Sequence, residues 1–150
     1  MTERAERSEG HEGMANEGAA MTVERVNPPE LAPPRGFSHA VVAHGTVVFL
    51  AGQTALDARG RIVGTDVVTQ FEKALSNLLA ALRAAGGRPD QLASLTVYAT
   101  DLAAYRFRAA DIGKVWRRLV GTDYPAMAGV GVARLWDDGA LVEVQGFAVV

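Results

Sequence analysis

Cysteine is absent from this 150-residue sequence, which excludes disulfide bonds, thiolate nucleophiles and metal sites built from cysteine. Basic blocks are absent as well: 15 Lys and Arg are dispersed among 17 Asp and Glu, and the formal net charge is −2. This balance does not indicate a nucleic-acid partner. No apolar run approaches the roughly 20 residues of a membrane span, and the N-terminus lacks the apolar core of a signal peptide. We expect a soluble, cytoplasmic protein without a membrane partner.

The N-terminal part of the sequence differs from the rest in composition. Residues 1–20 are rich in Glu, Gly, Ala and Ser and show no hydrophobic periodicity, whereas 49% of the whole chain is hydrophobic. Met21 looks as good a start as Met1, and the sequence leaves that choice open. Several prolines follow soon after and prevent a helix there. We expect a mobile tail over residues 1–24, followed by a single domain over residues 25–150.

The rest of the chain alternates between strand and helix patterns. Apolar residues recurring every three or four positions predict one helix from Val67 to Gly86–Gly87 and another over residues 103–120. Strand patterns occupy residues 39–44, 46–52, 92–100, 126–136 and 140–150. We expect the first two strands to join at His44–Gly45 and the last two to form a hairpin around Asp137–Gly139. This order predicts an α+β fold, in which one mixed sheet carries two helices on one face.

The strand over residues 46–52 is apolar on both faces. Val47, Phe49 and Ala51 point to one side, and the apolar residues between them point to the other. Two helices can cover only one side of a sheet, so the second side needs another cover. A second copy of the same chain is the simplest cover, and we therefore expect a homo-oligomer.

Glu143 is a carboxylate within an otherwise apolar strand, where burial without a partner would be costly. It shares a strand face with Leu141, Gln145 and Phe147. The opposite face is more apolar and contains Val142, Val144 and Ala148. We expect that apolar face to meet the helices, which places Glu143 on the face that needs a second copy. Two interpretations stay open: an ion pair at the rim of a subunit interface, or a carboxylate in an interface cleft that positions or deprotonates water.

Other chemistry has little support in the sequence. His39 and His44 lie five positions apart in or beside one strand, so they point to opposite faces and make poor joint metal ligands. Gly129 and Gly131 resemble half of a dinucleotide fingerprint, but no helix follows them. We expect neither a metal nor a cofactor.

Six segments, in this order and spacing, resemble the Rid/YjgF family of reactive-intermediate deaminases. They are GFSHAV, VFLAGQTALDARGRIVG, QFEKALSNLLAALRAAGG, LTVYATDLAAY, YPAMAGVGVARL and LVEVQGFAVV. The resemblance covers residues 25–150. It implies a chorismate-mutase-like fold and a homotrimer whose sheets pack inward, with small-molecule clefts between the subunits. A homotrimer agrees with the two apolar faces of the strand described above.

The resemblance also implies an activity, the hydrolysis of reactive enamines and imines such as 2-aminoacrylate to a ketoacid and ammonia. Glu143 matches the glutamate that handles water in the family and is the expected catalytic residue. The cleft positions that the resemblance implies are Phe37, Ser38, Ala51, Gly52 and Met127. Gly52 keeps the family's glycine. Phe37 replaces a tyrosine, Ala51 replaces a serine, and Met127 replaces the arginine that holds the substrate carboxylate.

These departures argue against an amino-acid-derived substrate. Loss of the contact to a guanidinium costs about 2–5 kcal/mol of carboxylate binding in a dry site. Arg134 lies seven residues beyond Met127 and would point to the opposite face of an unbulged strand. One interpretation is a divergent enzyme that uses Glu143 on a small neutral or apolar imine, enamine or related intermediate. The alternative is a non-catalytic trimer that binds a small apolar metabolite or a protein partner.

Overall fold

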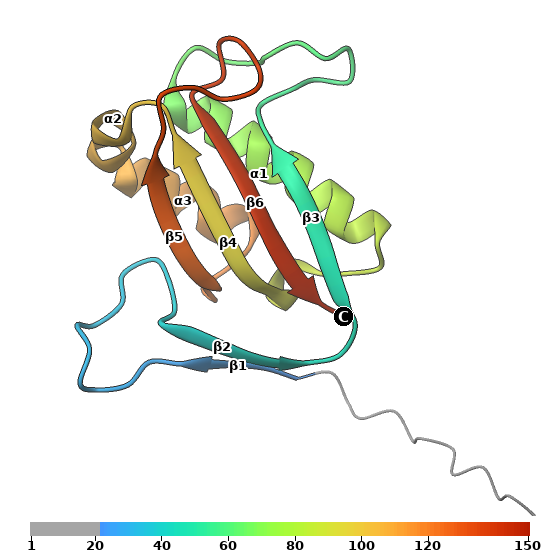
Figure 1. The fold of residues 1–150 in the computed structure, drawn as a ribbon, viewed down its shortest axis with the longest axis vertical. Helices are drawn as coiled ribbons and strands as arrows, with labels where there is room; N and C mark the ends of the chain where they lie inside the picture. The colour runs from blue at the N-terminus through green and yellow to red at the C-terminus, as the bar shows by residue number, and fades with distance from the viewer. Residues whose placement is uncertain (1–21) are drawn as a thin grey trace, which may run out of the picture.

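Residues 22–150 are described by the computed structural model, and they form an α+β fold. A four-stranded mixed sheet is covered on one face by helices, and a two-stranded ribbon lies beside one end of the sheet (Figure 1). The predicted fold class is therefore confirmed. Most of the predicted tail lies outside the described residues. Thr22–Glu24, which the sequence assigned to the tail, already belong to the first strand.

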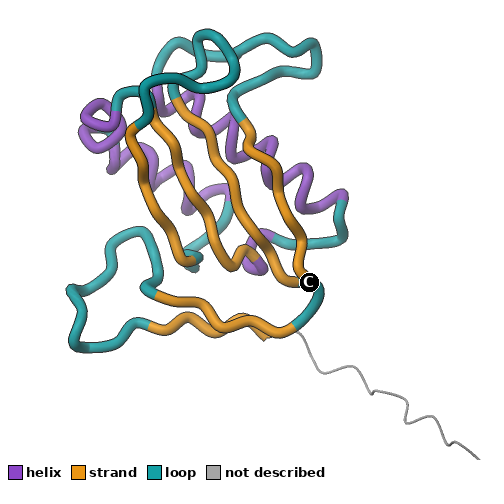
Figure 2. Tube along the Cα trace, viewed as in Figure 1, coloured by secondary structure: helices purple, strands orange, loops and turns teal. Residues whose placement is uncertain are grey.

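The strands are β1 (Thr22–Val26), β2 (Ala40–His44), β3 (Val47–Gln53), β4 (Leu92–Ala99), β5 (Ala126–Gly131) and β6 (Val142–Val149). The helices are α1 (Val67–Ala84), α2 (Leu102–Phe107) and α3 (Ala109–Leu119), with a short 3₁₀ turn at Pro89–Gln91. None of the helices in this part of the chain is both long and apolar enough to cross a membrane. Figure 2 shows that two long connections, residues 54–66 and 132–141, lie at the same end of the sheet.

The strand order in the main sheet is β3-β6-β4-β5, with β4 and β5 parallel and the other pairs antiparallel. The predicted hairpin of the last two strands is wrong, because β4 lies between β5 and β6 and residues 132–141 cross over its end. Burial explains this order. Alternate residues of β6 are fully buried beneath α1, which suits a central strand, whereas β5 is mostly exposed and occupies an edge.

The first two predicted strands do not pair with each other either. β2 pairs antiparallel with β1 in a separate two-stranded sheet, which the prediction of a single sheet lacked. The chain turns at Gly45, where φ is +148° and an added Cβ would collide with the backbone of Val150. Thr46 and Val150 exchange backbone hydrogen bonds of 2.7 and 2.9 Å. Gly45 therefore sends the chain from the ribbon into the main sheet.

The hydrophobic core lies between the main sheet and the helices. Helix α1 begins at the N-cap Asp66, whose Oδ1 accepts hydrogen bonds from the backbone of Val68 and Thr69, both at 3.0 Å. It ends before Gly86, which has a φ of +87°, as predicted. Its inner face contributes much of the core, namely Val67, Phe71, Ala74, Leu75, Leu78, Leu79 and Leu82.

The second predicted helix, over residues 103–120, is divided in two. Helix α2 ends and α3 begins at Arg108, whose backbone (φ −96°, ψ 15°) departs from helical geometry. The break lets α3 bury Ile112 and Trp116 while Phe107, the last residue of α2, is left 88% exposed. No proline or glycine marks the break, so hydrophobic periodicity could not reveal it.

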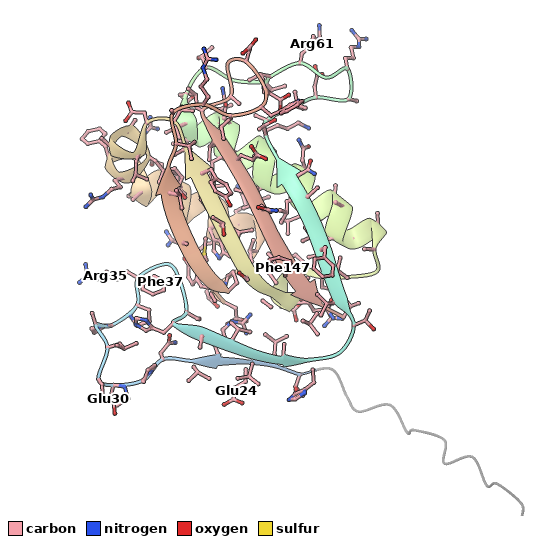
Figure 3. All side chains as sticks on the ribbon, viewed as in Figure 1. Glu24, Glu30, Arg35, Phe37, Arg61 and Phe147 are labelled. Carbon is pink, nitrogen blue, oxygen red and sulfur yellow. The ribbon has the colours of Figure 1, made fainter. Side chains whose placement is uncertain are left out.

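The face of the main sheet away from the helices carries large apolar side chains. Phe49 of β3 is 77% exposed, and its ring packs edge to face on Phe147 of β6 with centroids 5.3 Å apart. Figure 3 shows Phe147 on this side of the sheet. Leu50, on the opposite face of β3, is buried. The predicted alternation is confirmed, and we call the exposed surface the open face; it includes Val47, Phe49, Ala51, Glu143, Gln145 and Phe147.

Candidate functional site

Glu143 lies on the open face near the start of β6, beside the end of β3. The pairing of these strands shifts between Leu50 and Gln53, where β3 advances three residues while β6 advances two. The extra residue makes a bulge at Ala51–Gly52. Bulges bend the backbone locally, and this one brings the β3 main chain beneath the Glu143 side chain.

The carboxyl group of Glu143 lies directly on Gly52. A Cβ added at Gly52 would collide with Oε1 of Glu143 and would lie 2.9 Å from its carboxyl carbon. Glycine is therefore the residue that leaves room for the carboxylate in this position. The structure thus brings together three of the predicted site residues: Ala51, Gly52 and Glu143.

Two effects raise the pKa of the Glu143 carboxyl above its ordinary value. The larger is partial burial, which disfavours the charged form, and the second is repulsion by the Asp137 carboxylate. Within residues 22–150 of one chain, no lysine or arginine forms an ion pair with Glu143. A carboxyl with a raised pKa is suited to accept and return a proton near neutral pH.

Phe37 and Met127 lie together at the β5 edge of the sheet. Met127 pairs with Leu95 of β4, and paired residues point to the same face, so Met127 points toward the helices and packs on the core. Figure 3 shows Phe37 beside β5. The two side chains line a cavity of about 180 Å³ along this edge strand, together with Gly36, Val97, Tyr105, Ala128 and Gly129.

Tyr105 of α2 lines this cavity and also a second one of about 190 Å³, which α3 borders and which shares Met127. Burial raises the pKa of the Tyr105 phenol to about 12, so the phenol keeps its proton at neutral pH and can donate a hydrogen bond to a ligand. Sequence periodicity placed Tyr105 on the core face of a helix with Ile112 and Trp116. A residue that lines a cavity beside the core follows the same helical spacing as a core residue. The sequence therefore carried no signal that Tyr105 lines a cavity.

Ser38 has a different place from the other predicted cleft residues. It is buried, its hydroxyl donates to the carbonyl of Tyr124 at 2.7 Å, and its backbone N–H donates to the carbonyl of Pro125 at 2.9 Å. It also forms a parallel bridge with Ala126, the first residue of β5. These contacts attach the segment before β2 to β5, and Ser38 thereby positions its neighbour Phe37 at the cavity.

One chain alone does not bring all the predicted residues to one place. Ala51, Gly52 and Glu143 lie on the open face, whereas Phe37 and Met127 line a cavity at the β5 edge of the sheet. The two groups therefore do not form one pocket within a single chain.

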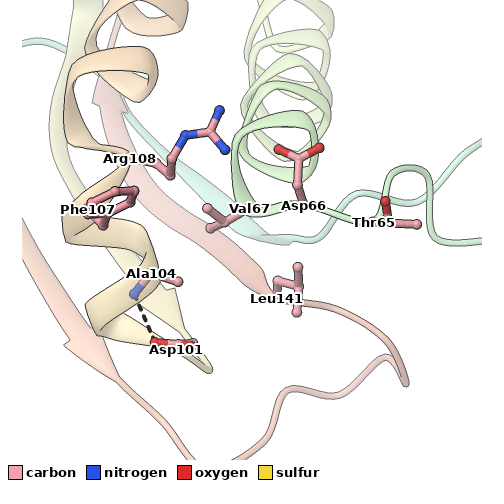
Figure 4. Close-up of a pocket in the computed structure, with 8 residues that line it drawn as sticks. All are labelled: Thr65, Asp66, Val67, Asp101, Ala104, Phe107, Arg108 and Leu141. Carbon is pink, nitrogen blue, oxygen red and sulfur yellow. Dashed lines mark hydrogen bonds between the residues drawn. The ribbon is translucent and has the colours of Figure 1, made fainter.

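A further cavity, of about 370 Å³, lies between the start of α1 and the break between α2 and α3, and it contains none of the predicted residues (Figure 4). Its two carboxylates already have structural roles: Asp66 caps α1, and Asp101 caps α2 by accepting a hydrogen bond of 2.9 Å from the backbone of Ala104. Across the described part of the chain, no three His, Cys, Asp or Glu side chains are grouped so that they could hold a metal ion.

The fold and the site together define a class of protein: a small α+β domain with helices on one face of a mixed sheet and, on the other, a glutamate that lies on a strand glycine. The chain belongs to the Rid/YjgF family. The family model described as Endoribonuclease L-PSP matches residues 28–150, and this confirms the resemblance inferred from the sequence segments.

Individual relatives agree with this assignment. A RutC family protein of Pyrococcus horikoshii is 34% identical over 113 residues, which are 75% of this chain and 85% of the relative. A 2-iminobutanoate/2-iminopropanoate deaminase of Capra hircus is 30% identical over 114 residues, which are 75% of this chain and 79% of the relative. The crystal structure of a Rid family protein of Yersinia pestis has a TM-score of 0.76 and 31% identity, covering 85% of this chain and 98% of its own.

Proposed function

We propose that this protein is a cytoplasmic homotrimer that binds a small neutral or apolar imine or enamine in a cleft between two subunits and hydrolyses it with Glu143. The observation that carries the proposal is the Glu143 carboxyl, which lies over Gly52 on an exposed apolar face and has a raised pKa. The relatives named as imine deaminases support the reaction class.

The positions of the two groups of residues support a composite cleft. The open face exposes Phe49 and Phe147, whose burial would favour association with another copy. The cavity at Phe37 and Met127 runs along β5, an edge strand of the main sheet, where an adjoining subunit can reach it. In a cyclic trimer each interface joins different surfaces of two protomers, so the open face of one can meet the β5 edge of the next.

Glu143 would serve in both halves of the hydrolysis. As a carboxylate it accepts a proton from water while the water oxygen bonds to the carbon of the C=N group, and it then gives this proton to the nitrogen, which completes a neutral carbinolamine. In the second half Glu143 accepts the hydroxyl proton as the C=O bond forms and gives it to the nitrogen as the C–N bond breaks, so that ammonia or an amine leaves. A raised pKa suits this role, because the proton must be held between the two steps.

The lining of the Phe37–Met127 cavity supports a substrate of low polarity. The thioether of Met127 and the ring of Phe37 cannot balance a carboxylate, and Tyr105 is the polar residue of this lining, whereas Arg35 lines the neighbouring cavity that shares Met127. This lining favours a ligand with an apolar body and a hydrogen-bond acceptor. It equally fits the alternative, a non-catalytic trimer that binds a small apolar metabolite or a protein partner. The net charge of −2 gives no support to the RNA substrate that the family's description suggests.

The proposal is tested with two variants that each damage one half of the cleft. Glu143→Gln removes the acid–base group and is expected to lower turnover about 100-fold or more. Met127→Trp fills the cavity and should also inactivate the protein. When the two are co-expressed in equal amounts, about a quarter of the interfaces combine an intact Glu143 with an intact Met127, so about a quarter of the wild-type rate should return.

The probe is the imine that a flavin amine oxidase makes from n-butylamine, and its loss is followed by semicarbazide trapping. Light scattering checks that each variant keeps the assembly of the wild type. If co-expression of the two variants restores no turnover, the composite cleft is contradicted. Full turnover in Glu143→Gln would contradict the catalytic role. Wild-type protein that binds n-butylamine but does not turn over the imine would leave the binding protein as the better explanation.

A second prediction concerns substrates that carry a carboxylate. Wild-type protein is expected to show little activity on imines made by an L-amino-acid oxidase, because the Phe37–Met127 cavity has no cation to hold their carboxylate. The triple variant Phe37→Tyr, Ala51→Ser, Met127→Arg should gain more activity than Met127→Arg alone. Each added hydrogen bond contributes about 1–3 kcal/mol in a dry site. Robust wild-type turnover of these imines would contradict this prediction.

A further inference from the structure

A second carboxylate, Asp137, is held close to the Gly52–Glu143 pair. The Thr54 hydroxyl donates a hydrogen bond to Oδ2 of Asp137 at 2.5 Å, and Thr54 directly follows the end of β3. Glu143 lies on Gly52, only two residues earlier in the chain. Both carboxylates are therefore attached to the same few residues of β3, although they come from different segments.

The loop that carries Asp137 is fixed to the core by α1. Gln70 is only 1% exposed; its Nε2 donates to the carbonyl of Gly139 at 3.0 Å, and its Oε1 accepts a hydrogen bond from the backbone of Leu141 at 2.8 Å. Asn77 of the same helix donates to the carbonyls of Thr54 and Leu56 at 3.1 and 2.9 Å. The position of Asp137 is thus set by partly buried hydrogen bonds on both sides of the Thr54 contact.

We propose that Asp137, held by Thr54, is a positioning residue that favours the proton-bearing form of Glu143 and so sets the pH range in which Glu143 returns a proton to a ligand. The claim about the pH range of proton return rests on the proposed function, whereas the effect of Asp137 on the protonation of Glu143 does not. The physical reason is repulsion: two carboxylates that share a partly buried site resist being charged together.

The other polar groups around Glu143 do not supply this effect. Tyr98, its partner on β4, donates its hydroxyl to Gln145 at 3.4 Å. Arg134 and Asp138 lie in the loop hollow beside Asp137, beyond the end of β5, so the strand alternation that the sequence suggested for Arg134 does not apply. Of these charged neighbours, only Asp137 contributes to the raised pKa of Glu143.

The experiment is a titration of the Glu143 carboxyl by carbon-13 NMR in the full chain, without substrate. Asp137→Asn removes the charge and keeps the shape, and the Glu143 midpoint should shift to lower pH. Asp138→Asn removes a neighbouring charge from the same loop and should leave the midpoint in place. Thr54→Ser keeps the hydroxyl and should behave as wild type, whereas Thr54→Val should shift the midpoint in the same direction as Asp137→Asn.

An unchanged midpoint in Asp137→Asn would overturn the proposal, and so would an equal shift in Asp138→Asn. The link to catalysis is checked separately with the n-butylamine-derived imine: the Glu143-dependent limb of the pH–rate profile should move with the NMR midpoint. If the NMR midpoint of Glu143 moves but this limb of the pH–rate profile stays in place, the claim that Asp137 sets the pH range of proton return is overturned. If Glu143→Gln retains full turnover, the proposed function fails, but the titration still decides the role of Asp137.

Discussion

Gly52→Ala is expected to abolish the activity that depends on Glu143 and to lower the free energy of unfolding by about 1–3 kcal/mol. The added methyl group would occupy the place of the carboxylate oxygen Oε1. Either the Glu143 side chain must leave its position or the β3 bulge must shift, and the carboxylate is misplaced in both cases. Turnover should fall about as far as in Glu143→Gln, that is, about 100-fold or more.

A double-mutant cycle separates this steric conflict from a general intolerance of alanine. Shortening the side chain in Glu143→Ala makes room for the methyl group, so Gly52→Ala should cost little stability in that background. Gly131→Ala is the matched control, because its added Cβ would approach Leu102 no closer than 3.4 Å. Denaturant unfolding of these variants gives the coupling energy. An equal loss of stability with and without Glu143 would show that Gly52 is needed for another reason.

Phe49→Asp is expected to convert the proposed trimer into monomers at micromolar concentration. Phe49 is 77% exposed on the open face and packs on Phe147, so a covering subunit would bury it. An aspartate there would place an unpaired charge in every interface, which is costly in an apolar environment. Light scattering should show the mass fall from about three times 15.9 kDa to 15.9 kDa, and turnover should be lost with the composite cleft.

Phe107→Asp is the control for this change of assembly. Phe107 is even more exposed, at 88%, but it lies at the end of α2 on the helix side of the sheet. The same substitution there should leave the mass of the assembly unchanged. A wild-type protein that runs as a monomer would contradict the proposed cover of the open face, as would dissociation by Phe107→Asp and not by Phe49→Asp.

The elements that the sequence predicted well depend on local periodicity. Helix α1 lies where apolar residues recur every three or four positions and stops at the predicted glycines. The alternation along β3 and β6 correctly separated Phe49 and Glu143 from the buried residues beside them. These patterns are local because the geometry of one strand or helix decides which of its side chains share a face.

Strand pairing could not be predicted in the same way. The turn residues at Asp137–Gly139 suggested a hairpin, yet β5 pairs with β4 in parallel and β6 lies on the other side of β4. Which strands become neighbours depends on how much of each the helices bury, and this is a property of the assembled fold. For the same reason the sequence did not predict where Met127 lies. The face of the sheet to which Met127 points depends on its pairing with Leu95.

By itself the sequence determined the family, the α+β class and the open-face position of Glu143. Only the tertiary structure decided that Gly52 supports the carboxylate, that Tyr105 lines the cavity at Met127, and that Asp137 is held by Thr54 across 83 positions of the chain. Contacts between residues so far apart follow from strand register, a bulge and a buried glutamine, and none of these leaves a periodic trace in the sequence.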